Sequence, residues 1–79
     1  MSAVTRDERE VALVRLARAI QRARALRGAS QETTAFEAGI SVRHYQELES
    51  GRLNPSYLTL RKVAVALNMP LARLLKNVD

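Results

Sequence analysis

The chain has 79 residues, with thirteen lysines and arginines, eight acidic residues, one histidine and no cysteine. A chain of this length forms one small domain, over residues 1–79, that buries only about 60% of its unfolded surface, so a dimer is an early expectation. The lack of cysteine excludes disulfide frameworks and thiol nucleophiles, and a single histidine excludes most zinc sites. No segment approaches the roughly 18 apolar residues of a membrane span, so we expect a soluble, unprocessed, cytoplasmic protein.

The net charge is +5, and the cations are eleven arginines and two lysines. A basic chain favours a polyanionic partner. Seven of the arginines lie within the first 27 residues, however, and a charge run of this kind is also typical of a solvated helix face. Charge alone therefore leaves a nucleic-acid partner and an unliganded surface as open alternatives.

The first predicted helix begins near Thr5 and ends near Arg27. Thr5 and Glu8 have the spacing of a capping box, and Gly28 provides the left-handed residue that commonly follows a helix. Apolar residues keep helical spacing along this segment: Val11, Leu13, Leu16, Ala17, Ile20 and Ala23.

Two short helices follow, each with its own start and stop signal. Ser30 is placed to cap a helix over about residues 31–38, which ends at Gly39. Ser41 is placed to cap the next helix, over about residues 42–50, which ends at Gly51. The turn between these two helices is only the three residues "GIS".

The remaining segment predicts two more helices after the turn "RLNPS". Ser56 can cap a fourth helix, Asn68 can stop it in a left-handed conformation, and Pro70 suits the first turn of a last helix through about Lys76. One face of the fourth helix would carry Tyr57, Leu60, Val63, Ala64 and Leu67. No stretch alternates with period two for long enough to be a strand, so the fold class is all-α with five helices.

The third predicted helix has two different faces. At 100° per residue, Tyr45 and Leu48 point one way, toward a core. The opposite face is compact and mostly polar, with Val42, Arg43, Gln46, Glu47 and Ser50. A polar face can simply be solvated, but the short turn before this helix and the small Ala35 in the helix before it are typical of a helix-turn-helix.

The segment from about Leu16 to Leu75 resembles the phage repressor and Cro-like helix-turn-helix family of XRE type. The matching elements are Ser30-Gln31-Glu32, Ala35, Gly39, Ser41, Glu49-x-Gly51, Asn54-Pro55-Ser56 and Thr59-Leu60. The stretch "SQETTAF" and the small size also resemble controller proteins of restriction-modification systems. The resemblance implies a compact, lambda-repressor-like five-helix domain, with a core over residues 16–75 and residues 1–15 as an extension of the first helix.

The resemblance also implies sites on double-stranded DNA, because the family places its third helix in the major groove. Base edges would be read by Val42, Arg43 and Gln46, with Glu47 alongside. Gln31 would contact a phosphate and brace the third helix. Backbone phosphates would be contacted by Ser41, His44, Ser50 and Arg52. Family members pair residues at the positions of Arg24 and Glu49, and such a pair would stiffen the third helix; the alternative is two independent surface charges.

Thr34, Ala38, Glu47 and Phe36 depart from the family pattern, and the last two keep alternatives open. Glu47 either orients Arg43 or stays exposed, or else it accepts a hydrogen bond from a cytosine amino group. Phe36 stands where an exposed residue is usual, and we expect the long first helix to cover it with Val11 or Leu13. The rival interpretation assigns Phe36 to a dimer surface.

A homodimer is the expected assembly, because one recognition helix makes few base contacts. The expected self-complementary patch contains Leu58, Val65, Met69 and Ala72. Nothing indicates an enzyme, since His44 has no partner for a metal or a nucleophile and the glycines only follow helices. We expect no cofactor and, because the sequence ends just after the fifth helix, no ligand-sensing domain and no small-molecule ligand. The alternative function is a protein-protein interaction module of antitoxin or anti-activator type on the same fold.

Overall fold

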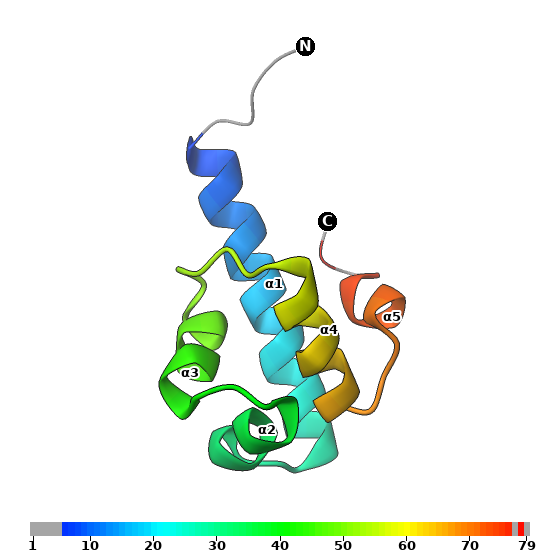
Figure 1. Ribbon diagram of the computed structural model, residues 1–79. Coiled ribbons are helices and arrows are strands. Elements are labelled where there is room, and N and C mark those ends of the chain that lie inside the picture. The colour runs from blue at the N-terminus through cyan, green and yellow to red at the C-terminus, as the bar shows by residue number, and fades with distance from the viewer. Residues whose placement is uncertain (1–5, 77, 79) are drawn as a thin grey trace.

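The computed structural model describes residues 6–76 and residue 78, and its regular elements are five α-helices (Figure 1). Their bounds are α1 Arg6–Arg27, α2 Gln31–Ala38, α3 Val42–Ser50, α4 Tyr57–Ala66 and α5 Leu71–Leu75. The predicted all-α class and the order of the elements are therefore confirmed. The predicted cap at Thr5 lies outside the described residues. Within the described part of the chain, no helix is long and apolar enough to cross a membrane.

Three serines start three of the helices, as the sequence predicted. The side chains of Ser30, Ser41 and Ser56 each accept a hydrogen bond from the backbone N–H three residues later. Because these bonds satisfy N–H groups that a helix leaves unpaired, each serine fixes where its helix begins. The prediction for Pro70 was wrong: this residue is the cap before α5 and not part of its first turn.

Four described residues have the left-handed conformation at helix stops: Gly28, Gly39, Gly51 and Asn68. Gly51 ends α3 with φ 79°, and a Cβ at this position would lie 3.2 Å from Cγ2 of Val14, so the chain here also needs a small residue against α1. Asn68 ends α4 with φ 59°, which confirms the predicted left-handed stop. These turns set the directions in which the chain leaves α3 toward α4 and leaves α4 toward α5.

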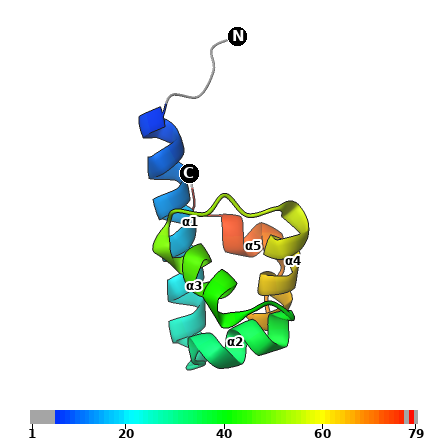
Figure 2. The same cartoon turned by 60° about the vertical axis from the view of Figure 1, so that its left-hand side comes forward.

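The helices enclose a core centred on the second half of α1. Its largest fully buried side chains include Tyr45 of α3, Ile20 of α1 and Val63 of α4. Helix α2 contacts α3 and α4, while α1 contacts α3 and α5, so α3 is held from two sides (Figure 2). Tyr57 does not share the buried face of α4: it is 62% exposed at the first position of that helix.

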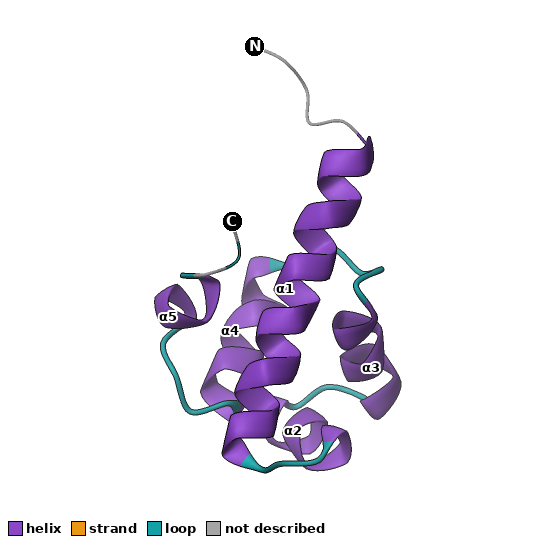
Figure 3. Ribbon diagram, turned by 180° about the vertical axis from the view of Figure 1, so that it is seen from behind, coloured by secondary structure: helices purple, strands orange, loops and turns teal. Residues whose placement is uncertain are grey.

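The first turns of α1 extend beyond the body of the domain (Figures 1 and 3). Helix α2 lies near the other end of α1, because it follows Arg27 after a short turn. Val11 precedes Arg27 by sixteen residues, which corresponds to about 24 Å of helix. The expectation that α1 covers Phe36 is therefore wrong, and Phe36 is 85% exposed.

Candidate nucleic-acid interface

The inner face of α3 is part of the core. Tyr45, Leu48 and Glu49 are the buried residues of this nine-residue helix. A helix this short is not stable in isolation, so its position depends on what this face contacts. Two of the three residues are the apolar pair that the helical spacing predicted, and the third is a buried acid that requires a partner.

Arg24 of α1 is that partner. Its Nε donates to Oε2 of Glu49 at 2.6 Å and its Nη2 donates to Oε1 at 3.0 Å, so the pair is bidentate. Arg24 Nη1 also donates to the carbonyl oxygen of Ala29, at 3.1 Å, in the turn before α2. One guanidinium thus links α1, the turn that leads into α2, and α3. The arrangement excludes two independent surface charges at these positions.

The charge on Glu49 is stabilised where it lies. Burial by itself would raise the pKa of Glu49, but the hydrogen bonds from Arg24 and Gln31, the neighbouring Tyr45 hydroxyl and the positive charge of Arg24 outweigh burial and lower that pKa. The same contact raises the pKa of Arg24. Glu49 is therefore a carboxylate at neutral pH and acts only as a hydrogen-bond acceptor.

Tyr45 lies beside this pair at the centre of the core. Burial first, and then the neighbouring Glu49 carboxylate, raise the pKa of its hydroxyl well above the ordinary range. Within the described residues this buried hydroxyl has no partner at good hydrogen-bond geometry. The ring of Tyr45 contributes mainly by packing, and its hydroxyl stays neutral.

Two glutamines add further contacts to Glu49. Gln31, at the start of α2, donates from Nε2 to Oε1 of Glu49 at 2.9 Å. Gln21 of α1 donates from Nε2 to the backbone carbonyl of Glu49 at 2.6 Å. Gln21 was not predicted, because a polar residue on an arginine-rich helix does not by itself indicate that it faces another helix. Only its position three residues before Arg24, on the same side of α1, is a signal that could have found it.

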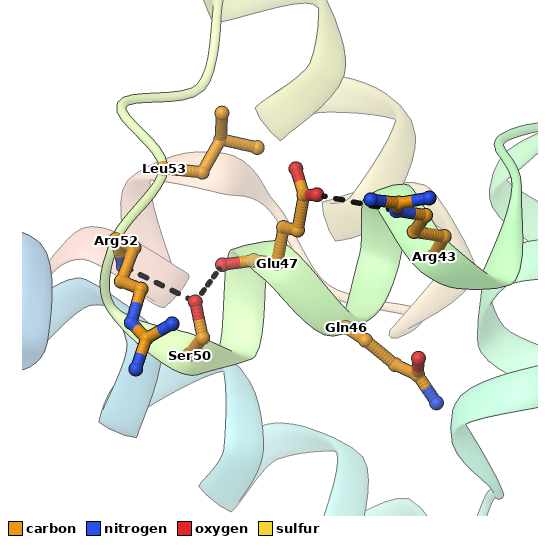
Figure 4. A pocket seen from close by; sticks show the side chains of 6 residues that line it. All are labelled: Arg43, Gln46, Glu47, Ser50, Arg52 and Leu53. Carbon is orange, nitrogen blue, oxygen red and sulfur yellow. Dashed lines mark hydrogen bonds and ion pairs between the residues drawn. The ribbon is translucent and has the colours of Figure 1, made fainter.

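The outer face of α3 borders an open hollow of about 400 Å³ (Figure 4). The side chains that line it are Arg43, Gln46, Glu47, Ser50, Arg52 and Leu53. Four of these side chains are predicted DNA contacts, and the structure brings them together on one surface: Arg43, Gln46, Ser50 and Arg52. Leu53 follows α3 in the loop and was not predicted, because an apolar residue in a turn usually indicates packing.

Arg43 and Glu47 form a second arginine-glutamate pair one turn apart on this outer face. Nε of Arg43 lies 3.7 Å from Oε1 of Glu47, and the Arg43 side chain is 91% exposed (Figure 4). This distance is too long for a good hydrogen bond, so the pair is a weak electrostatic contact. Its geometry agrees with an orienting role for Glu47 in the free protein.

The other predicted contact residues have structural tasks as well. Ser41 caps α3 by accepting from the N–H of His44. Ser50 donates to the carbonyl of Glu47 at 2.6 Å and accepts from the N–H of Arg52, which closes the end of the helix. Val42 is half-buried against the core, so only part of its side chain faces outward. His44 is half-buried too.

The residues expected at a dimer surface lie on α4, on α5 and between them. Val65 and Met69 border a common hollow of about 240 Å³ next to Pro70. Leu58, like Val65, is a large exposed apolar residue, and Ala72 is exposed on α5. The structure thus brings Val65 and Met69 together, while Leu58 and Ala72 do not line that hollow.

Comparisons with known proteins agree with this geometry. A profile of the helix-turn-helix family matches residues 20–74, which is well over half of the chain. Among solved structures, the restriction-modification controller protein C.AhdI from Aeromonas hydrophila is similar, with a TM-score of 0.76 and 32% sequence identity. The alignment covers 78% of this chain and 94% of that one. No curated protein matches the sequence. From the profile match and the controller-like fold, the chain belongs to the XRE-type helix-turn-helix family of DNA-binding transcription regulators.

Proposed function

We propose that this protein is a sequence-specific transcription regulator that binds double-stranded DNA as a homodimer, with residues 42–50 of α3 in the major groove. The observation that carries the proposal is the contrast between the two faces of α3. Its inner face is fixed to α1 and α2 through Glu49, while its outer face presents Arg43, Gln46 and Glu47 at an open hollow. A rigid helix with an exposed hydrogen-bonding face is what base readout requires.

Each exposed side chain of α3 has a base edge that suits it. Arg43 can fork onto O6 and N7 of guanine, and Gln46 can pair with N6 and N7 of adenine. Glu47 holds Arg43 in position in the free protein and releases it at small cost, because the pair is exposed. Val42 exposes less of its side chain than Arg43 and Gln46 do, because it is half-buried. We assign it a contact with a thymine methyl group.

The proposed contacts with phosphates come from the ends of α3 and from Gln31. Ser41 lies at its beginning, and Ser50 and Arg52 lie at its end. These contacts set the position of the protein on the duplex without selecting sequence. The positive net charge supports them, because neutralising phosphates releases counterions and favours binding.

The proposed dimer uses the patch of Leu58, Val65, Met69 and Ala72. A two-fold dimer would place two copies of α3 on half-sites about one helical turn, roughly 34 Å, apart. Supporting observations are the exposure of Val65 and the hollow that it shares with Met69, which can receive an apolar side chain. The similarity to a restriction-modification controller protein supports a regulatory role. Dimerisation would supply the affinity that a single recognition helix lacks.

Sedimentation of the Val65→Glu variant tests the dimer. A charged side chain in an apolar contact should raise the dimer dissociation constant by at least tenfold, while the helical content stays unchanged. Lys62→Glu is a control, because it places a glutamate at another exposed position of α4. A Val65→Glu protein that is as dimeric as the parent would exclude this surface.

Selection of bound duplexes from a random pool tests the function. The expected result is a motif with two-fold symmetry, and binding to it should weaken steeply with salt yet remain much tighter than binding to random duplex. Binding that falls with salt but shows no preferred motif would contradict sequence-specific regulation. Failure to bind duplex at any salt concentration would favour the protein-protein interaction module instead.

A further inference from the structure

The hollow beside α3 has two unlike side chains on one side. Glu47 brings a carboxylate, with its side chain 52% exposed, and Leu53 brings an apolar side chain from the loop after the helix. In Figure 4 the Leu53 side chain and the Glu47 carboxylate lie on the same side of α3, and Gln46 extends in the opposite direction. Leu53 also packs against the core, which fixes its position. A carboxylate and an apolar group at one opening make two separate demands on a base that enters it.

Glu47 needs a hydrogen-bond donor once the protein is on DNA. In the free protein its ion-pair partner is Arg43, with Nε 3.7 Å from Oε1. In the proposed complex Arg43 turns to guanine, and the Glu47 carboxylate is left near the phosphates. A carboxylate only accepts hydrogen bonds, and the donors that bases offer in the major groove are the amino groups of cytosine and adenine. Glu47 therefore requires an amino base, because guanine O6 or thymine O4 would oppose it with a second acceptor.

Leu53 needs an apolar partner. The apolar part of a base edge in the major groove is position 5 of a pyrimidine, which carries a methyl group in thymine. In cytosine this position is next to the carbon that bears the amino group, so one base can face Glu47 and Leu53 together. Adenine does not suit both residues, because its amino group has the N7 acceptor beside it. The base that suits the pair is consequently a pyrimidine.

We propose that Glu47 and Leu53 form a site for 5-methylcytosine, so that methylation of one cytosine in each half-site strengthens the binding of this protein to DNA. This base joins an amino group at C4 to a methyl group at C5. Unmodified cytosine offers only the first group, and thymine offers only the second. The proposal rests on the proposed function, since it requires the outer face of α3 to lie in the major groove.

The expected order of affinity is 5-methylcytosine, then cytosine, then thymine. A methyl group in contact with Leu53 should strengthen binding about fourfold for each half-site, which is the gain from burying one methyl-sized apolar group. Exchange of the amino group for the O4 acceptor of thymine should weaken binding about tenfold or more, because two acceptors then face each other.

Competition binding with modified operators tests the site in the full-length protein. Selection from a random pool with the parent and with Glu47→Gln first identifies the base pair at which the two preferences differ, and the parent should select cytosine there. Three operators then carry cytosine, 5-methylcytosine or thymine at this position in one half-site. Methylation of a cytosine at a position without sequence preference is the control on the DNA and should leave the affinity unchanged. The proposal is overturned if no such base pair exists, if the parent selects adenine there, or if methylation does not strengthen binding.

Leu53→Ser tests the apolar half of the site. The preference for 5-methylcytosine over cytosine should fall from about fourfold to less than about 1.5-fold, while cytosine stays preferred over thymine. Leu53→Met keeps an apolar side chain and should retain the preference. Ile40→Ala is the matched control for stability, because Ile40 is also half-buried against the core but lies in the turn before α3. Its methyl preference should be that of the parent. A methyl preference that survives Leu53→Ser would overturn the proposal.

Glu47→Gln tests the polar half of the site. Glutamine keeps an acceptor oxygen for the amino group of cytosine but adds a donor that suits thymine O4. The preference for 5-methylcytosine over thymine should shrink to about threefold or less, whereas the preference for methylated over unmethylated cytosine should stay. Unchanged discrimination against thymine would be the contrary result. If the parent selects a motif but does not respond to methylation, this proposal alone has failed; if it selects no motif, the proposed function has failed as well.

Discussion

Helix α3 participates in two arginine-glutamate pairs that differ in almost every physical respect. Arg24 and Glu49 are bidentate, at 2.6 and 3.0 Å, with side chains only 22% and 5% exposed. Arg43 and Glu47 lie 3.7 Å apart, with side chains 91% and 52% exposed. The residue types are the same and the helix is the same. Burial is what separates a pair that holds the structure together from a pair that can exchange partners.

The difference follows from the cost of removing charge from water. A buried carboxylate that loses its partner is destabilised strongly, so Arg24 and Glu49 keep each other in place. An exposed pair gains about 0.2–1 kcal/mol, so Arg43 can leave Glu47 for another acceptor with little loss. In α3, the buried pair fixes the position of the helix, and the exposed pair is ready to exchange partners. Four predictions test this comparison, from the largest expected effect to the smallest.

Glu49→Gln should have the largest effect, because it leaves Arg24 without its counter-charge. We expect the free energy of unfolding to fall by about 2–3 kcal/mol, below the cost of breaking a fully buried pair, since Arg24 is partly exposed. Urea unfolding measures the change, and a proposed operator duplex should also bind more weakly. Unchanged stability together with unchanged binding would contradict a structural role for the pair.

Acid should break the same pair without mutation. The pKa of Glu49 is lowered in the folded protein, so its contribution to stability is fully present above the ordinary carboxyl pKa of 4.5 and is lost as the pH falls through the folded-state value. The stability difference between the parent and Glu49→Gln should therefore shrink as the pH decreases below about 4.5. Urea midpoints for both proteins at neutral and acid pH measure it, and a constant difference would be the contrary result.

Arg43→Ala should affect DNA and leave the fold intact. Stability should change by less than about 0.5 kcal/mol, because this side chain is exposed. Discrimination at the guanine that we assign to Arg43 should fall by about 1–3 kcal/mol. Competition binding with operators altered at that base pair measures the loss. A variant that selects the same motif with the same preferences would remove Arg43 from its proposed role.

Glu47→Gln should have the smallest effect on stability and is the matched partner of Glu49→Gln. The same chemical change on the outer face should alter the free energy of unfolding by less than about 0.5 kcal/mol. Binding to duplex should strengthen slightly, because a negative charge is removed from the reading face. A loss of stability close to that of Glu49→Gln would show that burial does not separate the two pairs.

Much of the fold was predictable because its signals are local. Ser30, Ser41 and Ser56 cap the helices that they were expected to cap, since an N-cap needs only the next three residues. The period of Tyr45 and Leu48 similarly identified the inner face of α3. The candidate site was anticipated as a set of residues on one helix face, for the same reason.

Several of the errors and omissions involve contacts between distant segments. Phe36 was expected under α1, but α1 projects away from α2, and no local pattern states where a helix end will lie. Tyr57 has the spacing of a core residue yet lies at the start of α4, where the face turns toward solvent. Gln21 was missed because its partner is a backbone carbonyl 28 residues further along the chain.

The sequence by itself determined the five helices, the starts of α2, α3 and α4 and the polar face of α3, because capping and periodicity act over one or two helical turns. The tertiary structure alone decided that Glu49 accepts from both Arg24 and Gln31, and that Gln46 donates to Gln31. These bonds join three helices, and their directions depend on which side chains meet in the folded protein. Helix propensity does not determine which side chains come into contact. The packing of α1, α2 and α3 around Tyr45 brings them together.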